Sequence, residues 1–173
     1  ILSDKYKEHF LSPYLVHYYN DDKELTLSNI LNQKDINKGV FDFSGSILPL
    51  SSEGKTIWLS FDVMNRSSKA FWKIDFGNSD MGRFGLFNSI ESYTYNYIEN
   101  ELIENRFTDQ KIILTDIPIN QKSKIILKLE MINGTPATLP LRLLHQDVEP
   151  SSDKNTIFLI KITLLIGMIF FFS

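Results

Sequence analysis

Three tyrosines at alternate positions form the part of this 173-residue chain whose spacing could make a binding site. Tyr93, Tyr95 and Tyr97 lie in the segment SYTYNYIE, residues 92–99, and a spacing of two places side chains on one face of a β-strand. On an exposed face, such rings stack on the apolar faces of sugars while their hydroxyls form hydrogen bonds. On a buried face they belong to the core, with the polar residues between them outside. The usual burial of aromatic side chains favours this second alternative.

Two more residues complete the candidate site. Trp72 in AFWKIDF offers another flat ring, and Arg83 offers a cation that can anchor an anion or sugar hydroxyls. The alternatives are a core position for Trp72 and a solvated surface position for Arg83. Because a sugar site needs flat rings together with a few aimed hydrogen bonds, the sequence predicts a carbohydrate-like small-molecule ligand. The predicted ligand-binding residues are Trp72, Arg83, Tyr93, Tyr95 and Tyr97.

No residue pattern indicates catalysis or a bound metal. The chain has no cysteine, which excludes thiolate zinc sites, iron–sulfur clusters and a cysteine nucleophile. Its three histidines, His9, His17 and His145, lack the spacing of metal ligands on a helix, and no G-x-S-x-G, P-loop or H-E-x-x-H motif is present. We therefore predict no catalytic residue, no metal and no cofactor, and we do not expect this segment to be an enzyme.

The charged residues narrow the function classes further. There are 18 basic and 21 acidic residues, a net charge of −3, and without a basic stripe a nucleic-acid partner is not expected. Acidic pairs such as Asp21 and Asp22 leave a membrane-anchored hydrolase as an alternative. A glycosidase needs two carboxylates that face each other across a cleft, whereas acidic pairs in turns are usually solvated.

Short strands separated by turns account for most of the chain. Turn signals recur about every 8–12 residues and no long amphipathic helix lies between them, which is typical of an all-β sandwich. One short helix is predicted at residues 25–32, with its cap near Thr26 or Ser28. The predicted strands are residues 13–19, 55–65, 70–76, 83–88, 92–99, 111–118, 123–132 and 139–145. Together they predict a two-sheet antiparallel jelly-roll β-sandwich over about residues 10–148.

The segment KTIWLSFDVMN, residues 55–65, has the clearest alternation of apolar residues. Its odd-numbered positions from Ile57 to Val63 are all apolar, so one face of this strand is predicted to face the core. Trp58 lies on the opposite face, where it is either exposed or in contact with a second core. The burial habit of tryptophan favours the second core.

The last segment differs from everything before it. Residues 156–173 read TIFLIKITLLIGMIFFFS, with Lys161 as the only charge. This length is close to the minimum for crossing a hydrocarbon layer of ~30 Å. We predict a domain at residues 1–150, a linker at 151–155 and the beginning of a transmembrane helix at 156–173; a buried C-terminal element of the same domain is the alternative. Because the chain begins with Ile1, we expect it to be a piece of a longer protein.

The distribution of charge also predicts a location. All 21 acidic residues and all but one of the 18 basic residues precede the apolar segment. Cytoplasmic flanks of membrane spans usually carry an excess of Lys and Arg, so the positive-inside rule places residues 1–155 in the periplasm or extracellular space. The absence of cysteine is compatible with a bacterial periplasm.

The order of several motifs resembles that of a known sensor family. The chain is similar to the second type of extracellular sensor domain found in bacterial seven-transmembrane receptors with diverse intracellular signalling modules. The resemblance covers essentially the whole chain and includes the apolar segment with its glycine. The motifs that carry it are SPYLVHYYNDDKELTLSNIL, TIWLSFDVMNRS, FWKIDFGNSDMGRFGLFNS, ILTDIPINQKSKIILKLEMINGTPATLPLRLLH and LLIGMIFFF.

This resemblance implies a jelly roll similar to carbohydrate-binding modules, a periplasmic sensing role and a cell-membrane location. It also implies seven helices and a cytoplasmic output domain, such as a histidine kinase or diguanylate cyclase, beyond this segment. The chain departs from the family at Ser60, where a basic residue is frequent, and between Tyr97 and Lys111, where a Gly-Asp turn is usual. A module that forms a homodimer or binds a protein, without a small-molecule ligand, is the alternative function.

The predicted topology can be tested with reporter fusions. In the intact protein, a periplasm-active reporter fused at residue 10 is expected to be active, because residues 1–155 precede the first span on the outer side. Activity from a cytoplasm-active reporter alone at the same position would reverse the orientation.

Overall fold

A computed structural model describes most of the chain before residue 149. The described residues are 1–19, 24–34, 36–40, 48–50, 56–76, 87–109, 112–131, 137–139 and 141–148. The strands are β1 (Glu8–Phe10), β2 (Val16–Tyr19), β3 (Asn37–Val40), β4 (Leu48–Leu50), β5 (Thr56–Met64), β6 (Phe71–Asp75), β7 (Phe87–Asn96), β8 (Glu101–Glu104), β9 (Arg106–Asp109), β10 (Ile112–Asp116), β11 (Lys122–Met131), β12 (Ala137–Leu139) and β13 (Arg142–His145). The helices are the 3₁₀ helix η1 (Ser12–Tyr14) and the α-helix α1 (Leu27–Asn32).

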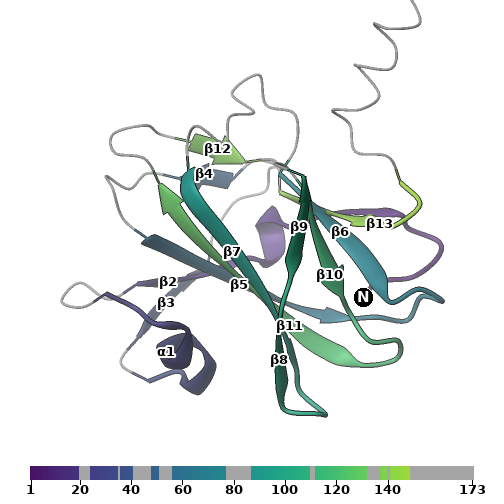
Figure 1. Ribbon diagram of the computed structural model, residues 1–173, viewed down its shortest axis with the longest axis horizontal. Coiled ribbons are helices and arrows are strands. Elements are labelled where there is room, and N and C mark those ends of the chain that lie inside the picture. Colours follow the sequence, from purple (N-terminus) through teal and green to yellow (C-terminus); the bar gives the residue numbers. More distant parts are fainter. Residues whose placement is uncertain are drawn as a thin grey trace, which may run out of the picture.

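Two antiparallel sheets form the body of the domain (Figure 1). One sheet has five strands in the order β1-β13-β6-β10-β9, and the other has six in the order β3-β2-β5-β11-β7-β8. A separate short ribbon pairs β4 with β12. The expected all-β fold with two antiparallel sheets is therefore confirmed.

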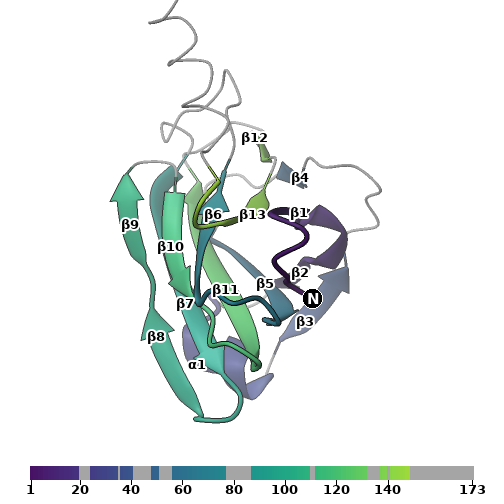
Figure 2. The same cartoon turned by 90° about the vertical axis from the view of Figure 1, so that its right-hand side faces the viewer.

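The two sheets are joined along one edge by a single continuous stretch of chain. β8 belongs to the six-stranded sheet and β9 to the five-stranded sheet, and only Asn105 separates them. Figure 2 shows β8 and β9 following one another along this edge. The Asn105 side chain donates to Ser92 Oγ at 2.8 Å and accepts from Thr94 Oγ1 at 3.0 Å. Because Thr94 Oγ1 also lies 2.7 Å from Thr115 Oγ1 on β10, a buried polar network links the sheets here.

Apolar side chains fill the space between the sheets. Leu59, Phe61 and Val63 of β5 are all buried in this main core, which confirms the expected inward face of that strand. Trp72 of β6 is fully buried among them. The other members are Leu2, Leu11, Leu15, Ile74, Phe76, Ile113, Ile117, Ile125, Leu127, Leu129, Leu141 and Leu143.

A second apolar cluster lies on the outer face of the six-stranded sheet, beneath α1. Trp58 is buried there with Tyr18, Ile30 and Ile126, and its indole N–H donates to the carbonyl of Leu25 at 3.1 Å. The expected second core contact of Trp58 is therefore confirmed. The burial of Ile30, a residue of α1, shows that the helix covers this part of the sheet.

The sequence also predicts how α1 begins. Thr26 is the N-cap: its side chain accepts from the backbone N–H of Asn29 at 3.3 Å, and the Asn29 side chain accepts from the backbone N–H of Thr26 at 3.0 Å. This reciprocal pair satisfies two N–H groups that a helix start leaves without intrahelical partners. Of the two caps considered, Thr26 is the correct one.

The structure corrects several strand boundaries. β7 runs from Phe87 to Asn96 as one strand, so the turn expected between segments 83–88 and 92–99 is wrong; residues 83–86 lie outside the described residues. The segment expected to be a strand from residue 13 begins instead as η1. Strands β1, β3, β4, β8, β9 and β12 are missing from the expected set, because each has only three or four residues, which is too few for alternation to be recognised.

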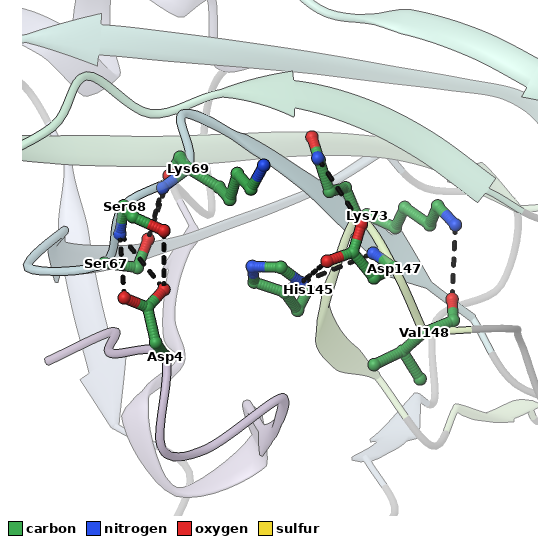
Figure 3. Close-up of polar contacts among 9 residues, drawn as sticks. Asp4, Ser67, Ser68, Lys69, Lys73, His145, Asp147 and Val148 are labelled. Carbon is green, nitrogen blue, oxygen red and sulfur yellow. Dashed lines mark hydrogen bonds and ion pairs between the residues drawn. The ribbon is translucent and has the colours of Figure 1, made fainter.

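The end of the described chain is fastened to the five-stranded sheet (Figure 3). The backbone N–H of Asp147 donates to His145 Nδ1 at 3.3 Å, and Lys73 Nζ of β6 donates to the carbonyl of Val148 at 3.2 Å. His145 is buried and meets the Trp72 ring edge-on, with 5.3 Å between centroids. In the part of the chain that the structure describes, no helix is long and apolar enough to cross a membrane. The predicted linker at 151–155 and the predicted span at 156–173 lie outside that part.

Two neighbouring aromatic residues of β6, one buried and one exposed, allow a matched test of the core. Trp72→Ala is expected to lower the free energy of unfolding by about 3–5 kcal/mol, because a fully buried aromatic side chain is lost. Phe71→Ala, one residue earlier and 52% exposed, is expected to cost less than about 1 kcal/mol. Urea unfolding of both variants checks the difference. Equal losses would contradict the assignment of Trp72 to the core.

Candidate functional site

The tyrosine stripe lies on the outer face of the six-stranded sheet. Ser92, Thr94 and Asn96, the residues that alternate with it, point between the sheets and are buried. Tyr97, just past the end of β7, is 41% exposed, and Tyr95 is half-buried. The stripe therefore does not belong to the core between the sheets. These buried polar side chains have hydrogen-bond partners within the protein: Asn105 bonds Ser92 and Thr94, and Asn96 donates to Gln121 Oε1 at 2.7 Å.

Tyr95 and Tyr97 form an angular aromatic surface. Their ring centroids are 5.3 Å apart and their planes meet at 79°, the edge-to-face geometry that aromatic pairs prefer. The Tyr95 hydroxyl donates to Asn100 Oδ1 at 2.5 Å. Asn100 closes the turn between β7 and β8 with a φ of 53°, a left-handed conformation that asparagine tolerates well. This turn fixes the direction of the Tyr95 ring.

Charged side chains from β5 and β11 stand beside these rings. In the strand register, Lys124 of β11 pairs with Tyr95 of β7 and with Asp62 of β5. Asp62 Oδ1 accepts from the Tyr97 hydroxyl at 2.9 Å, and Asp62 Oδ2 lies 3.1 Å from Lys122 Nζ. Lys122 Nζ also lies 5.1 Å from the centroid of the Tyr97 ring. The site therefore combines two rings, two ammonium groups and one carboxylate.

The Tyr97 hydroxyl is held in its protonated form. Partial burial and the hydrogen bond to the Asp62 carboxylate both raise the pKa of Tyr97 above its ordinary value. At neutral pH the group therefore remains a donor to Asp62, and this bond fixes the ring.

Tyr93 belongs to a different environment. It packs against the cluster around Trp58, and its hydroxyl donates to Glu91 Oε2 at 2.5 Å. Burial is the largest cause of the raised pKa of Tyr93, which is about 12, and the hydrogen bond to Glu91 is the second. The same hydrogen bond is the main cause of the lowered pKa of Glu91. Lys128 Nζ lies 3.1 Å from Glu91 and 3.0 Å from Glu130. Tyr93 thus packs at the edge of the cluster beneath α1, and Tyr95 and Tyr97 are the tyrosines of the stripe that form the candidate binding surface.

Of the other two predicted ligand residues, only Trp72 can be located in the structure, and it does not join this surface. Trp72 is fully buried between the sheets and belongs to the five-stranded sheet, so its expected place in a surface platform is wrong. Arg83 lies outside the described residues. Arg142, another arginine that could hold an anion, forms ion pairs with Glu8 at 2.7 Å and with Asp75.

Four residues of the site were missing from the sequence prediction: Asp62, Asn100, Lys122 and Lys124. Each is polar, and none has a spacing that singles it out. They meet the tyrosines through strand pairing and the β7–β8 turn, so only the register of β5, β11 and β7 could have revealed them.

Comparison with known proteins adds no relative. A scan against protein-family models finds no match, and searches of curated proteins and of solved structures find none. Among the described residues, no group of three or more histidine, aspartate or glutamate side chains is placed to hold a metal ion.

The exposure of the tyrosines predicts how the fold tolerates their loss. Tyr95→Ser with Tyr97→Ser is expected to lower the free energy of unfolding by at most about 2 kcal/mol, because both rings lie at the surface. Tyr18→Ser is the matched control. That ring is buried and bonded to Ser60, so its loss is expected to cost about 3–5 kcal/mol. A double variant that loses its cooperative unfolding transition would show that the stripe supports the fold.

Proposed function

We propose that this domain binds a carbohydrate-like ligand on the outer face of its six-stranded sheet, with Tyr95 and Tyr97 as the stacking rings. The observation that carries the proposal is the inverted pattern of β7, which buries Ser92, Thr94 and Asn96 and leaves the tyrosines outside. Rings that serve only the fold are normally the buried ones. In β7 the polar side chains point into the interior, so the rings of Tyr95 and Tyr97 lie on the outer face, where a ligand can reach them.

The rings are already held in place before a ligand arrives. Asp62 fixes Tyr97 and Asn100 fixes Tyr95 through their hydroxyls. A ligand that stacks on these rings therefore pays little for ordering them, which favours binding. Sugars suit such a surface because their ring faces are apolar and their edges carry hydrogen-bonding groups.

The wider role in this proposal is a sensor domain of a membrane receptor. The domain adopts a jelly-roll topology, lies in the periplasm or extracellular space, and is followed by the first transmembrane helix at residues 156–173. Ligand binding would bias the helices and a cytoplasmic output domain. The order of motifs that resembles the seven-transmembrane receptor family supports this role, as does the two-sheet antiparallel fold.

A protein partner is the second function that this surface fits. Ile98 is 69% and Leu102 is 36% exposed, and Leu102 lies opposite Tyr95 in the sheet. Exposed aliphatic side chains next to aromatic rings are typical of protein interfaces. In that case the domain would form a homodimer or bind another protein through the β7–β8 hairpin.

Binding to immobilised oligosaccharides tests the first function. Tyr97→Ala is expected to weaken saccharide binding at least tenfold, about 1.4 kcal/mol, because the stacking ring is removed. Tyr14→Ala is the control, since Tyr14 is exposed but lies in η1, outside this face. Equal binding by the wild-type protein, Tyr97→Ala and Tyr14→Ala would contradict the proposal. Dimerisation in analytical ultracentrifugation that is lost in Ile98→Ser would instead support the protein interface.

A further inference from the structure

We infer that the ligand of this face is an acidic saccharide, a sugar ring with a carboxylate or sulfate group that Lys122 binds. The inference rests on the proposed function and adds the chemical class of the ligand. It follows from which hydrogen-bonding groups beside the rings are occupied and which have capacity left.

The acceptors beside the two rings are engaged by the protein itself. Asp62 Oδ1 accepts from the Tyr97 hydroxyl, and Asp62 Oδ2 lies 3.1 Å from Lys122 Nζ. Asn100 Oδ1 accepts from the Tyr95 hydroxyl. Both tyrosine hydroxyls therefore donate their hydrogen bonds to acceptors of the protein itself. Among the described residues around the rings, the oxygens of Asp62 and Asn100 are thus already hydrogen-bonded or ion-paired within the fold.

The donors beside the rings exceed the acceptors. An ammonium group has three N–H donors, and Lys122 meets Asp62 with its side chain still 51% exposed. Lys124 Nζ lies 4.0 Å from the same carboxylate, so two positive charges share one negative charge. The remaining capacity of the site is thus positive and donating, which matches an anionic group with several acceptor oxygens.

Charged groups are distributed unevenly along the outer face of the six-stranded sheet. At the Tyr93 end, Lys128 is surrounded by Glu91 and Glu130, and Glu104 lies opposite Tyr93 in the register. The Tyr93 end thus groups three carboxylates with one ammonium, whereas two ammonium groups, of Lys122 and Lys124, meet the single carboxylate of Asp62 beside Tyr97. An acidic saccharide is therefore expected to place its anionic group near Lys122 and its ring over Tyr95 and Tyr97.

Lys122 must turn to meet the ligand, and its present contacts allow this. It lies over the Tyr97 ring and beside Asp62, but exposed cation–π contacts and exposed ion pairs are both weak. When the ammonium moves toward the anionic group, the face of Tyr97 that it covers becomes available for stacking. One movement therefore supplies both the ion pair and the ring face.

The test compares a saccharide with its own neutral derivative. An array of neutral, uronate-containing and sulfated oligosaccharides identifies the best binder, and calorimetry then measures it before and after methyl esterification or desulfation. The wild-type domain is expected to bind the anionic form at least tenfold more tightly. In Lys122→Gln this ratio is expected to fall to about one, whereas Lys69→Gln, a control at an exposed lysine outside this face, keeps the wild-type ratio.

The outcomes separate this inference from the proposed function. Tyr97-dependent binding with equal affinity for the anionic and neutral forms would overturn the inference and leave the proposed function standing. The same loss of preference in Lys122→Gln and Lys69→Gln would also overturn it, because it would show general attraction to charge. An array without any bound saccharide would contradict both.

Discussion

The rest of the structure depends on the polar network at the edge where the two sheets meet. Asn105 stands at the crossing from one sheet to the other and binds Ser92 and Thr94, while Thr94 reaches Thr115 on the opposite sheet. These groups are buried, so each bond must be present in the folded state, because an unpaired buried polar group is costly. The network therefore fixes which face of β7 points inward. Once that face is set, the period of two places the tyrosines outside.

The second constraint is the position of α1 on the same outer face. The helix contributes Ile30 to the buried cluster of Trp58 and Ile126, and Tyr93 packs against this cluster. The cluster beneath the helix is buried, whereas Tyr97 on the same outer face is 41% exposed. No helix in the described part of the chain covers Tyr95 and Tyr97, and local hydrogen bonds to Asn100 and Asp62 orient them instead. The open surface is thus a consequence of a six-residue helix on a much wider sheet.

Sequence alone predicts those helices and strands that are marked by a clear local pattern, such as apolar alternation or a capping residue. The alternation from Ile57 to Val63 and the helix cap near Thr26 or Ser28 depend on neighbours in the chain, and the structure confirms the first and selects Thr26 for the second. The orientation of β7 could not be predicted in this way, because alternation separates two faces without saying which one is buried. Trp72 was misplaced for a related reason, since a tryptophan between apolar neighbours fits a core and a platform equally well. Asp62, Lys122 and Lys124 required the strand register, which arises from long-range pairing.

The arrangement at Tyr97 illustrates how a β-sandwich can keep an aromatic ring at its surface without loss of order. A free tyrosine at a strand end has rotamer freedom that any ligand must remove. Here the hydroxyl is tied to a carboxylate on β5, and that carboxylate is held by Lys122 of the intervening strand β11. The ring, the anion and the cation thus come from three strands whose spacing the sheet already fixes. Preorganisation of the site is therefore a property of the sheet, and the same pairing that stabilises the fold determines the geometry offered to a ligand.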